Sequence, residues 1–445
     1  MRGPGLVRDR GGEAGGDSCR HVRHGQRPRG DDRSGGDEAL RPEPARDHQG
    51  AQSPPAAVPS DRGVRTLRAN RHRRALGIDG PRQGACRRGQ VTAPRRVAVI
   101  PAGGAGTRLW PRSRASTPKH VLPFADRGRP LLRATYDRAR LVADEVFVLT
   151  EARQRQIIEA VLPEVDESHL ILEPYARGTT NAYGLASLIL NERTPGAVMI
   201  ALPADHVVHG KAEVSKAVRA AVQAAATTGC LVTVGLRPTF PSTGLGYIHA
   251  PGRASHGTLR VRRFIEKPDA ASARRFVREG GYFWNLAWFS WRLEVFIEEL
   301  ARHAPRRLAA LRKVVAARSA GDEVTANRLY QRLPVEVVDR TVMEKTDRLL
   351  LVPAAFDWAD IGNWAELGDH AHADARGNSV DGEAILIDTT NSLVFGDRRL
   401  VAAIGLQDMI IVDTEDALLV VPRSRAQDVR KVVEALKRAR KTRYL

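Results

Sequence analysis

From about residue 95 onward, the chain alternates short runs of branched apolar residues with longer stretches whose apolar residues recur at helical spacing. The continuous apolar runs predict buried strands at 97–100, 145–149, 169–172, 197–202 and 230–235. The intervening stretches predict helices at 129–142, 151–162, 179–191 and 211–228. Strands that alternate with helices predict an α/β fold with a doubly wound, mostly parallel sheet, whose ligands bind outside the carboxyl ends of the strands.

The pattern changes twice toward the C-terminus. Residues 245–291 are mixed, with short strands expected at 246–250 and 259–266 and an aromatic-rich segment at 282–291. Three helices (292–302, 305–317 and 324–332) and a strand near 348–353 are expected next. After about Ala373, short β-like runs alternate with turn residues, and a basic helix is expected at 424–440. We therefore predict a sheet domain over 93–372 and a small β-rich C-terminal domain over 373–445.

The first 92 residues have a different composition. They hold 19 Arg, no Lys and 11 Asp or Glu, which accounts for +8 of the formal net charge of +19. So little apolar surface cannot offset chain entropy, and we expect residues 1–92 to be disordered. Two alternatives stay open: the segment precedes the true start of the protein, with Val91 as the initiating position, or it is an arm for nucleic acid. Because it has no aromatic stacking platform, we expect no nucleic-acid partner.

Composition also limits the compartment. No run approaches 18 consecutive apolar residues, so no membrane association is expected. Cys19, Cys86 and Cys230 lie far apart, without metal-type spacing, and their odd number argues against a disulfide framework. These features favour a reducing, cytoplasmic setting.

The segment from Val97 to Phe124 carries the first candidate chemistry. After the strand at 97–100, the loop 102–106 has almost no side chains, so its backbone N–H groups can approach a polyphosphate or a base closely. Arg108 and Lys119 place two cations just downstream. The segment lacks both the Gly-Lys-Ser/Thr ending of a P-loop and the third glycine of the dinucleotide fingerprint. The predicted nucleotide-binding residues here are Ala102, Gly103, Gly104, Gly106, Thr107 and Arg108; the alternative is a tight turn with a chance glycine cluster.

Downstream pairs narrow this prediction. Trp110-Pro111, Pro118-Lys119 and the following Leu122-Pro123-Phe124 resemble the signature of the sugar-nucleotide pyrophosphorylases, and within them the mannose branch. The resemblance runs from about Arg95 to the C-terminus. It implies a Rossmann-like nucleotidyltransferase that moves GMP from GTP to mannose 1-phosphate, giving GDP-mannose and pyrophosphate. Alternatives are transfer from dTTP or UTP to glucose 1-phosphate, or a non-catalytic regulator that binds a sugar nucleotide. A homodimer through the C-terminal segment is left open.

Two aspartates are candidate metal ligands. Asp205 follows an apolar strand, which places it at the carboxyl end of that strand, and Asp360 lies in a Trp-x-Asp-x-Gly segment. Mg²⁺ prefers one or two carboxylates together with substrate phosphates and waters. The resemblance implies that Asp205 and Asp360 share this cofactor. The alternative is a capping residue and a turn residue, and His206 is expected to be a hydrogen-bonding partner and not a ligand.

The remaining candidates concern the sugar phosphate and the nucleotide. In Phe264-Ile265-Glu266-Lys267-Pro268, Glu266 could accept sugar hydroxyls while Lys267 supplies a charge for the phosphate. Gly246 and Asn285 are assigned to the sugar, and Arg177 and Thr179 to the nucleotide, by resemblance alone. In this sequence Leu245 replaces a tyrosine of the family pattern, and Leu286-Ala287 add bulk beside Asn285. The expected catalytic residues are Arg108, Lys119, Asp205, Lys267 and Asp360.

Overall fold

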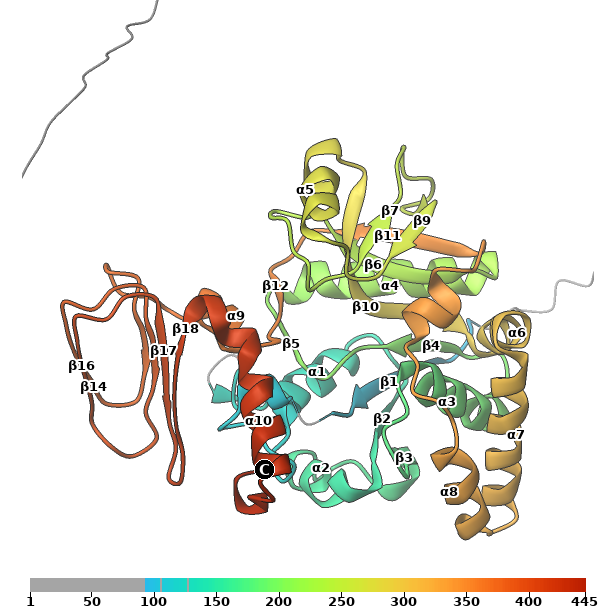
Figure 1. Ribbon diagram of the computed structural model, residues 1–445. Helices are drawn as coiled ribbons and strands as arrows, with labels where there is room; N and C mark the ends of the chain where they lie inside the picture. The colour runs from blue at the N-terminus through green and yellow to red at the C-terminus, as the bar shows by residue number, and fades with distance from the viewer. Residues whose placement is uncertain (1–92, 105, 126–127) are drawn as a thin grey trace, which may run out of the picture. The chain divides into compact units, whose positions relative to one another are not determined.

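The computed structural model describes residues 93–445 except residues 105, 126 and 127. The expectations for residues 1–92 therefore lie outside the described residues. Residues 93–445 belong to one compact unit, and its main sheet runs in the order β3-β2-β1-β4-β10-β6-β11-β8 (Figure 1). The strands of this path are β1 (Arg96–Ala102), β2 (Glu145–Glu151), β3 (Leu170–Glu173), β4 (Val198–Ala201), β6 (Leu231–Leu236), β8 (Leu259–Arg260), β10 (Tyr282–Arg292) and β11 (Leu349–Ala354).

Four of the seven neighbouring pairs along this path are parallel, as expected for a mostly parallel central sheet. The parallel pairs are β1 with β2 and β4, β2 with β3, and β6 with β11. The exception among the central strands is β10, which runs antiparallel between β4 and β6. The aromatic-rich segment at 282–291 is thus a central strand. Because both faces of β10 are buried, its sequence lacks the alternation that would have identified it.

Two layers of helices cover the sheet because each strand buries both of its faces. On β1, Val97 and Val99 point into one apolar core, while Ala98 and Ile100 point into the other. The helices of the first core are α3 (Thr179–Arg193), α6 (Leu293–His303), α7 (Pro305–Ser319) and α8 (Glu323–Gln331). Those of the second are α1 (Leu131–Ala139), α2 (Arg155–Val161) and α4 (Lys211–Thr228).

A smaller layer lies at one end of β10. There β7 (Tyr247–His249) pairs with both β10 and β9 (Arg263–Ile265), and α5 (Ala270–Glu279) packs against them. β5 (His206–Val208) and β12 (Trp358–Asp360) form a separate antiparallel pair. Among the described residues, no helix is long and apolar enough to cross a membrane.

The C-terminal strands wind in parallel coils, drawn in red in Figure 1. β13 pairs in parallel with β15, β15 with β17, and β14 with β16, while β18 returns antiparallel to β17. These strands are β13 (Ser379–Asp381), β14 (Ala384–Ile387), β15 (Leu393–Phe395), β16 (Val401–Ile404), β17 (Met409–Asp413) and β18 (Leu418–Pro422). The sequence predicted strands here but not their parallel winding, and the domain boundary at 372/373 stays a prediction.

One apolar core is shared between these coils and the segment that follows the glycine loop. Leu109 and Trp110 from that segment pack with Phe395 of β15 and Val412 of β17. The same core takes residues from α9 (Trp364–His370) and from α10 (Val429–Arg438), which follows the short helix η7 (Arg423–Asp428). The predicted basic helix at 424–440 therefore consists of these two consecutive helices.

Candidate active site at the carboxyl edge of the sheet

The candidate site begins where β1 and β4 end. The glycine loop follows β1, and Asp205 comes four residues after β4, on a connection held by the hydrogen bond from Ala204 N to Pro101 O (3.2 Å). The pairing of β12 with β5 then places Asp360 opposite His206, next to Asp205 in the chain. Two aspartates more than 150 positions apart thus meet beside the carboxyl end of β4, although Asp360 lies on the antiparallel pair of β5 and β12 and was paired with Asp205 by the family resemblance.

Lys119 joins the two aspartates. Its Nζ lies 2.9 Å from Asp205 Oδ2 and 3.1 Å from Asp360 Oδ1, and the lysine is buried. Burial by itself lowers the pKa of Lys119, but the two carboxylates outweigh it and hold that pKa above its usual value. Burial raises the pKa of Asp205, and the attraction of Lys119 reverses this effect and holds it well below its usual range. The site is therefore a buried cation held between two carboxylates.

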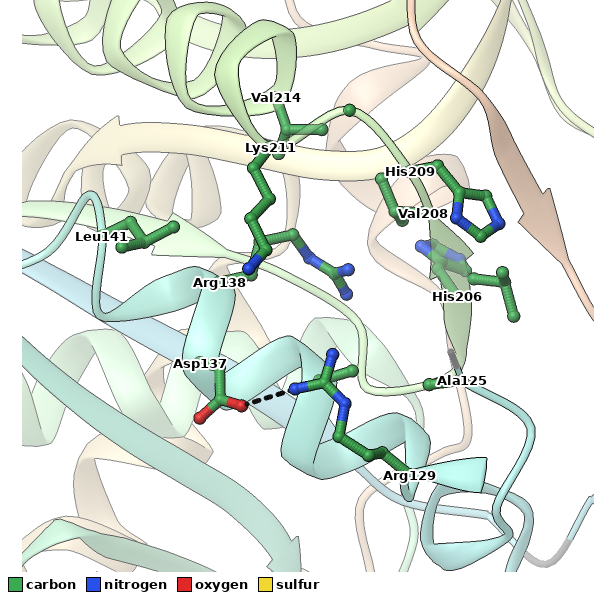
Figure 2. A pocket seen from close by; sticks show the side chains of 13 residues that line it. Ala125, Arg129, Asp137, Arg138, Leu141, His206, Val208, His209, Lys211 and Val214 are labelled. Carbon is green, nitrogen blue, oxygen red and sulfur yellow. Dashed lines mark hydrogen bonds and ion pairs between the residues drawn. The ribbon is translucent and has the colours of Figure 1, made fainter. Parts of the chain in front are cut away.

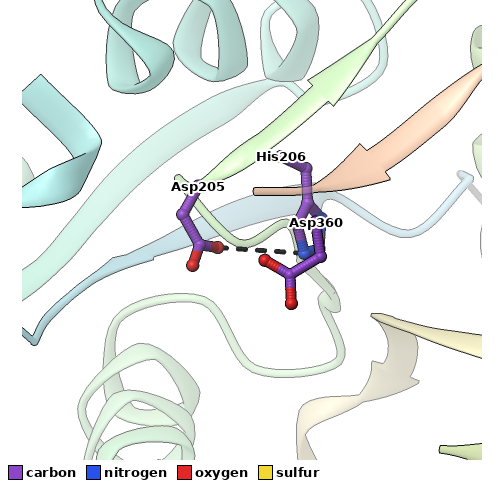
Figure 3. A group of neighbouring side chains, drawn as sticks. All are labelled: Asp205, His206 and Asp360. Carbon is purple, nitrogen blue, oxygen red and sulfur yellow. Dashed lines mark ion pairs between the residues drawn. The ribbon is translucent and has the colours of Figure 1, made fainter. Parts of the chain in front are cut away.

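His206 completes the cluster, and Figure 3 shows its ring beside both aspartates. Its Nδ1 accepts a hydrogen bond from Trp288 Nε1 (3.0 Å), which assigns the ring proton of the neutral imidazole to Nε2. That Nε2 faces Asp205 Oδ1 at 3.8 Å. Burial lowers the pKa of His206, which favours this neutral form. With Nε2 protonated and Nδ1 accepting from Trp288, His206 has no free lone pair to offer a metal.

The donor set fits a hard divalent cation. The potential ligand atoms of Asp205, His206 and Asp360 lie within 4.8 Å of one another. With both ring nitrogens of His206 unavailable, two carboxylates remain, which is the protein contribution that Mg²⁺ commonly takes alongside phosphate oxygens and waters. Asp205 is 41% and Asp360 35% exposed at the side chain, so both can reach a ligand from solvent.

The glycine loop lies next to this cluster because Gly106 packs directly on Lys119. A Cβ on Gly106 would lie 2.5 Å from the Cβ of Lys119, and its φ of 60° also favours glycine. Gly103 and Gly104 are exposed, and a Cβ built on either would meet none of the described atoms within 4 Å. Their backbone is open to a ligand. Arg108 is exposed, and its Nη1 donates to Gln427 Oε1 (3.0 Å).

A second cluster gathers the residues expected to bind the sugar phosphate. Gly246 O accepts a hydrogen bond from Asn285 N (2.9 Å), and a Cβ on Gly246 would lie 2.9 Å from Glu266 Oε2. Lys267 Nζ pairs with Glu266 Oε1 at 2.9 Å and is 58% exposed. The structure thus brings Gly246, Glu266, Lys267 and Asn285 together, and a side chain at position 246 would displace the carboxylate of Glu266.

Asp339 is a residue of this cluster that sequence reasoning missed. Asn285 Nδ2 donates to Asp339 Oδ1 (3.0 Å), and Asn285 Oδ1 accepts from Ala287 N (3.0 Å). Burial, and then the charge of Glu266, raise the pKa of Asp339 to about 7. Asp339 lies outside every motif described above, and only the fold brings it to Asn285.

The two clusters lie at the same edge of the sheet. On β10, Phe289 pairs with Ala201 near the end of β4, and the strand reaches Asn285 beyond that end because it runs antiparallel. The buried Tyr183 is influenced by both clusters: burial raises the pKa of its phenol, and the charges of both Asp339 and Asp205 add to that rise. A ligand at this edge can therefore reach both clusters.

Arg177 and Thr179 lie elsewhere on this edge. Thr179 Oγ1 accepts from Val338 N (2.9 Å), and Arg177 O accepts from Glu336 N (3.3 Å). Both residues therefore contact the segment before Asp339, and no recorded hydrogen bond joins them to the described part of the glycine loop. The Arg177 Nε atom is buried without a hydrogen-bond partner in the described part of the chain. Their nucleotide role stays a prediction.

A separate hollow lies behind His206, between α1, β5 and the first turn of α4 (Figure 2). Figure 2 shows Arg129 paired with Asp137 (3.1 Å) at one side and Arg138 and Lys211 at another. Sequence reasoning did not predict this hollow because its lining comes from several separate segments.

Three features meet at the carboxyl edge of this α/β sheet: an open glycine loop, a lysine paired with two carboxylates, and a second polar cluster. Together they define an enzyme that binds phosphorylated ligands. Comparison with known proteins narrows this class. A family model described as "Nucleotidyl transferase" matches residues 97–377, and one described as "MannoseP isomerase/GMP-like beta-helix domain" matches residues 382–436. The chain belongs to the nucleotidyl transferase family, and its C-terminal coils match the β-helix domain of that second description.

Several relatives are similar over most of their length. The mannose-1-phosphate guanylyltransferase of Escherichia coli is 36% identical over 355 residues, which cover 78% of this chain and 75% of the relative. The xanthan biosynthesis protein XanB of Xanthomonas campestris pv. campestris (strain B100) is 36% identical over 348 residues, covering 77% and 73%. A crystal structure from Thermus thermophilus, described as a mannose-1-phosphate geranyltransferase, has a TM-score of 0.69 and 34% identity, covering 77% of this chain and 99% of that one.

Proposed function

We propose that this protein transfers GMP from GTP to mannose 1-phosphate, giving GDP-mannose and pyrophosphate. The observation that carries the proposal is Lys119, held between Asp205 and Asp360 directly beside the glycine loop with its open backbone at Gly103 and Gly104. The names of the relatives support guanine and mannose as the base and the sugar. The reaction needs a cradle for a polyphosphate and a place for a second phosphorylated substrate, and the two clusters supply both.

The chain's own residues supply charge and position. The glycine-loop amides and Arg108 bind the polyphosphate, and Lys119 offers its ammonium to the same charge. Gly246, Glu266 and Asn285 bind the sugar, and Lys267 exchanges its ion pair with Glu266 for one with the sugar phosphate. That phosphate is already ionised near neutral pH, so its oxygen can attack the α-phosphorus of GTP in line without a general base.

Asp205 and Asp360 would hold Mg²⁺ as the cofactor. The ion would supply charge neutralisation on the reacting phosphates. His206 packs beside Asp205, with Nε2 at 3.8 Å from its carboxylate. Lys119 now occupies the space between the carboxylates, so we infer that it turns toward phosphate when a divalent cation binds.

A pyrophosphate-release assay tests the proposal with four NTPs against mannose 1-phosphate and glucose 1-phosphate. We expect release with GTP and mannose 1-phosphate, its loss in EDTA and its return with excess Mg²⁺. Asp205→Asn should lower kcat at least about 100-fold, within the range for loss of one preorganised electrostatic group. Asp357→Asn is the matched control, because that exposed aspartate lies three residues before Asp360 outside the cluster. Release only with UTP or dTTP and glucose 1-phosphate would contradict the assignment, and so would full activity of Asp205→Asn.

A further inference from the structure

The segment that carries Arg108 is held by residues from the C-terminal part of the chain. Trp110 is buried, its Nε1 donates to Tyr444 O (2.8 Å), and its own carbonyl accepts from Trp364 Nε1 (2.9 Å). The residue is thus fixed through both its indole and its backbone, while its ring joins the apolar core shared with β15 and β17. The position of Trp110, two residues after Arg108, is therefore set from outside the main sheet.

Two arginines extend this attachment. Arg114 makes a bidentate pair with Asp416 (2.8 and 2.6 Å), and Arg112 donates to Asp397 Oδ1 (3.1 Å). The Arg112 guanidinium also lies 5.4 Å from the ring centroid of Phe395. Exposed ion pairs contribute little one by one, but bidentate and stacked geometry adds directional restraint. The segment 108–114 is therefore attached to the C-terminal coils along its length.

Arg108 itself is reached by η7. Its Nη1 donates to Gln427 Oε1 at 3.0 Å, and α10, which follows η7, packs against the short helix Thr107–Leu109. An amide oxygen is neutral, so this bond fixes the direction of the guanidinium and adds no negative charge to that of the nearby Glu366. A carboxylate at the same place would orient Arg108 and also neutralise it.

We propose that the C-terminal coils and η7 form part of the nucleotide-binding half of the site, with Gln427 as the positioning residue that holds Arg108 toward the polyphosphate of GTP. This proposal rests on the proposed function, because it assigns Arg108 to the GTP side. Gln427 touches Arg108 and not the reacting atoms. Its effect therefore falls on GTP and leaves the binding of the sugar phosphate unchanged.

Steady-state kinetics of Gln427→Ala and Gln427→Glu test the proposal. In Gln427→Ala the side chain of Arg108 is freed and must be reordered when GTP binds. We therefore expect the KM for GTP to rise roughly three- to tenfold, with the KM for mannose 1-phosphate unchanged. Gln427→Glu should raise the KM for GTP at least as much, because it neutralises Arg108. The matched control is Arg425→Ala on the same short helix, whose exposed side chain pairs with Asp428 and not with the glycine-loop segment. It should leave both KM values at the wild-type level.

A double-mutant cycle separates positioning from a general structural effect. If Gln427 acts through Arg108, Gln427→Ala should change the KM for GTP less than about twofold in an Arg108→Ala background. The melting temperature of the Gln427→Ala single variant should stay within about a degree of wild type, because a surface substitution of this kind rarely changes stability. The inference would be overturned if the effects of Gln427→Ala and Arg108→Ala on the KM for GTP multiplied independently. It would also be overturned if Gln427→Ala raised the KM for GTP and the KM for mannose 1-phosphate equally. Failure of the proposed function is distinguishable, since the wild-type protein itself would then release no pyrophosphate from GTP and mannose 1-phosphate.

Discussion

Glu173 makes the stability of the protein depend on pH in a direction opposite to that of most carboxylates. It lies at the carboxyl end of β3, is 6% exposed, and accepts a hydrogen bond from the buried hydroxyl of Tyr330. Burial raises the pKa of Glu173 to about 7; the Tyr330 bond opposes this rise, and the charge of Glu151 adds to it. In the unfolded chain, the same carboxyl has an ordinary pKa of about 4.5.

The sign and the size of the effect follow from these two values. Between the unfolded and folded pKa values, the unfolded chain has already lost the proton that the folded protein keeps, so the free energy of unfolding falls as the pH rises. The fall ends above the folded pKa. A difference of about 2.5 pKa units corresponds to about 3 kcal/mol at pH 8, of which about 2 kcal/mol develops between pH 5 and pH 8.

Glu173→Gln removes this titration and keeps an oxygen that can accept from Tyr330. We expect the variant to gain about 2 kcal/mol over wild type between pH 5 and pH 8, measured as unfolding free energies from urea denaturation at both values. Glu167→Gln is the control, because that glutamate is 75% exposed and pairs with Arg155 at the surface. Parallel pH curves for wild type and Glu173→Gln would refute the assignment of a buried, proton-holding carboxyl at this position.

Two other substitutions give defined outcomes. Asp339→Ala removes the acceptor of Asn285 Nδ2, so the KM for mannose 1-phosphate should rise roughly fivefold, while Asp339→Asn, which keeps an acceptor, should stay near wild type; equal effects of the two variants would contradict this role. Gly178→Ala should destabilise the protein by about 2 kcal/mol or more, because φ is +81° and the new Cβ would lie 2.1 Å from Glu336 O. Gly321→Ala, with φ +76° and open space around it, should lower the free energy of unfolding by only about 1 kcal/mol. Thermal unfolding of both glycine variants measures this difference.

The sequence predicts the parts of this molecule that depend on local pattern. β1, β2, β4 and β6 appear where the apolar runs lie, and α4 has the predicted bounds because its apolar residues keep helical spacing. The meeting of Asp205 with Asp360 also follows from strand ends and from the family resemblance. These features need information from only one or two segments at a time.

Features that depend on long-range packing could not be predicted. Asp339 acquires its contact with Asn285 only after β10 enters the sheet antiparallel, and β10 has no alternation that distinguishes a strand from a buried helix. Gln427 meets Arg108 across 319 positions through one hydrogen bond. No spacing rule connects such pairs, because the tertiary fold alone brings them together.

The apolar core that joins Leu109 and Trp110 to the C-terminal coils has a consequence for building hybrid proteins. A crossover placed near residue 373 cuts between the predicted domains in sequence, yet it divides this core between two parents. Exchanging the coils with those of a relative should therefore require exchanging residues 107–131 and α9 as well, so that Trp110, its partners Trp364 and Tyr444 and the facing strands come from one parent. The true unit of recombination in this protein is discontinuous along the chain.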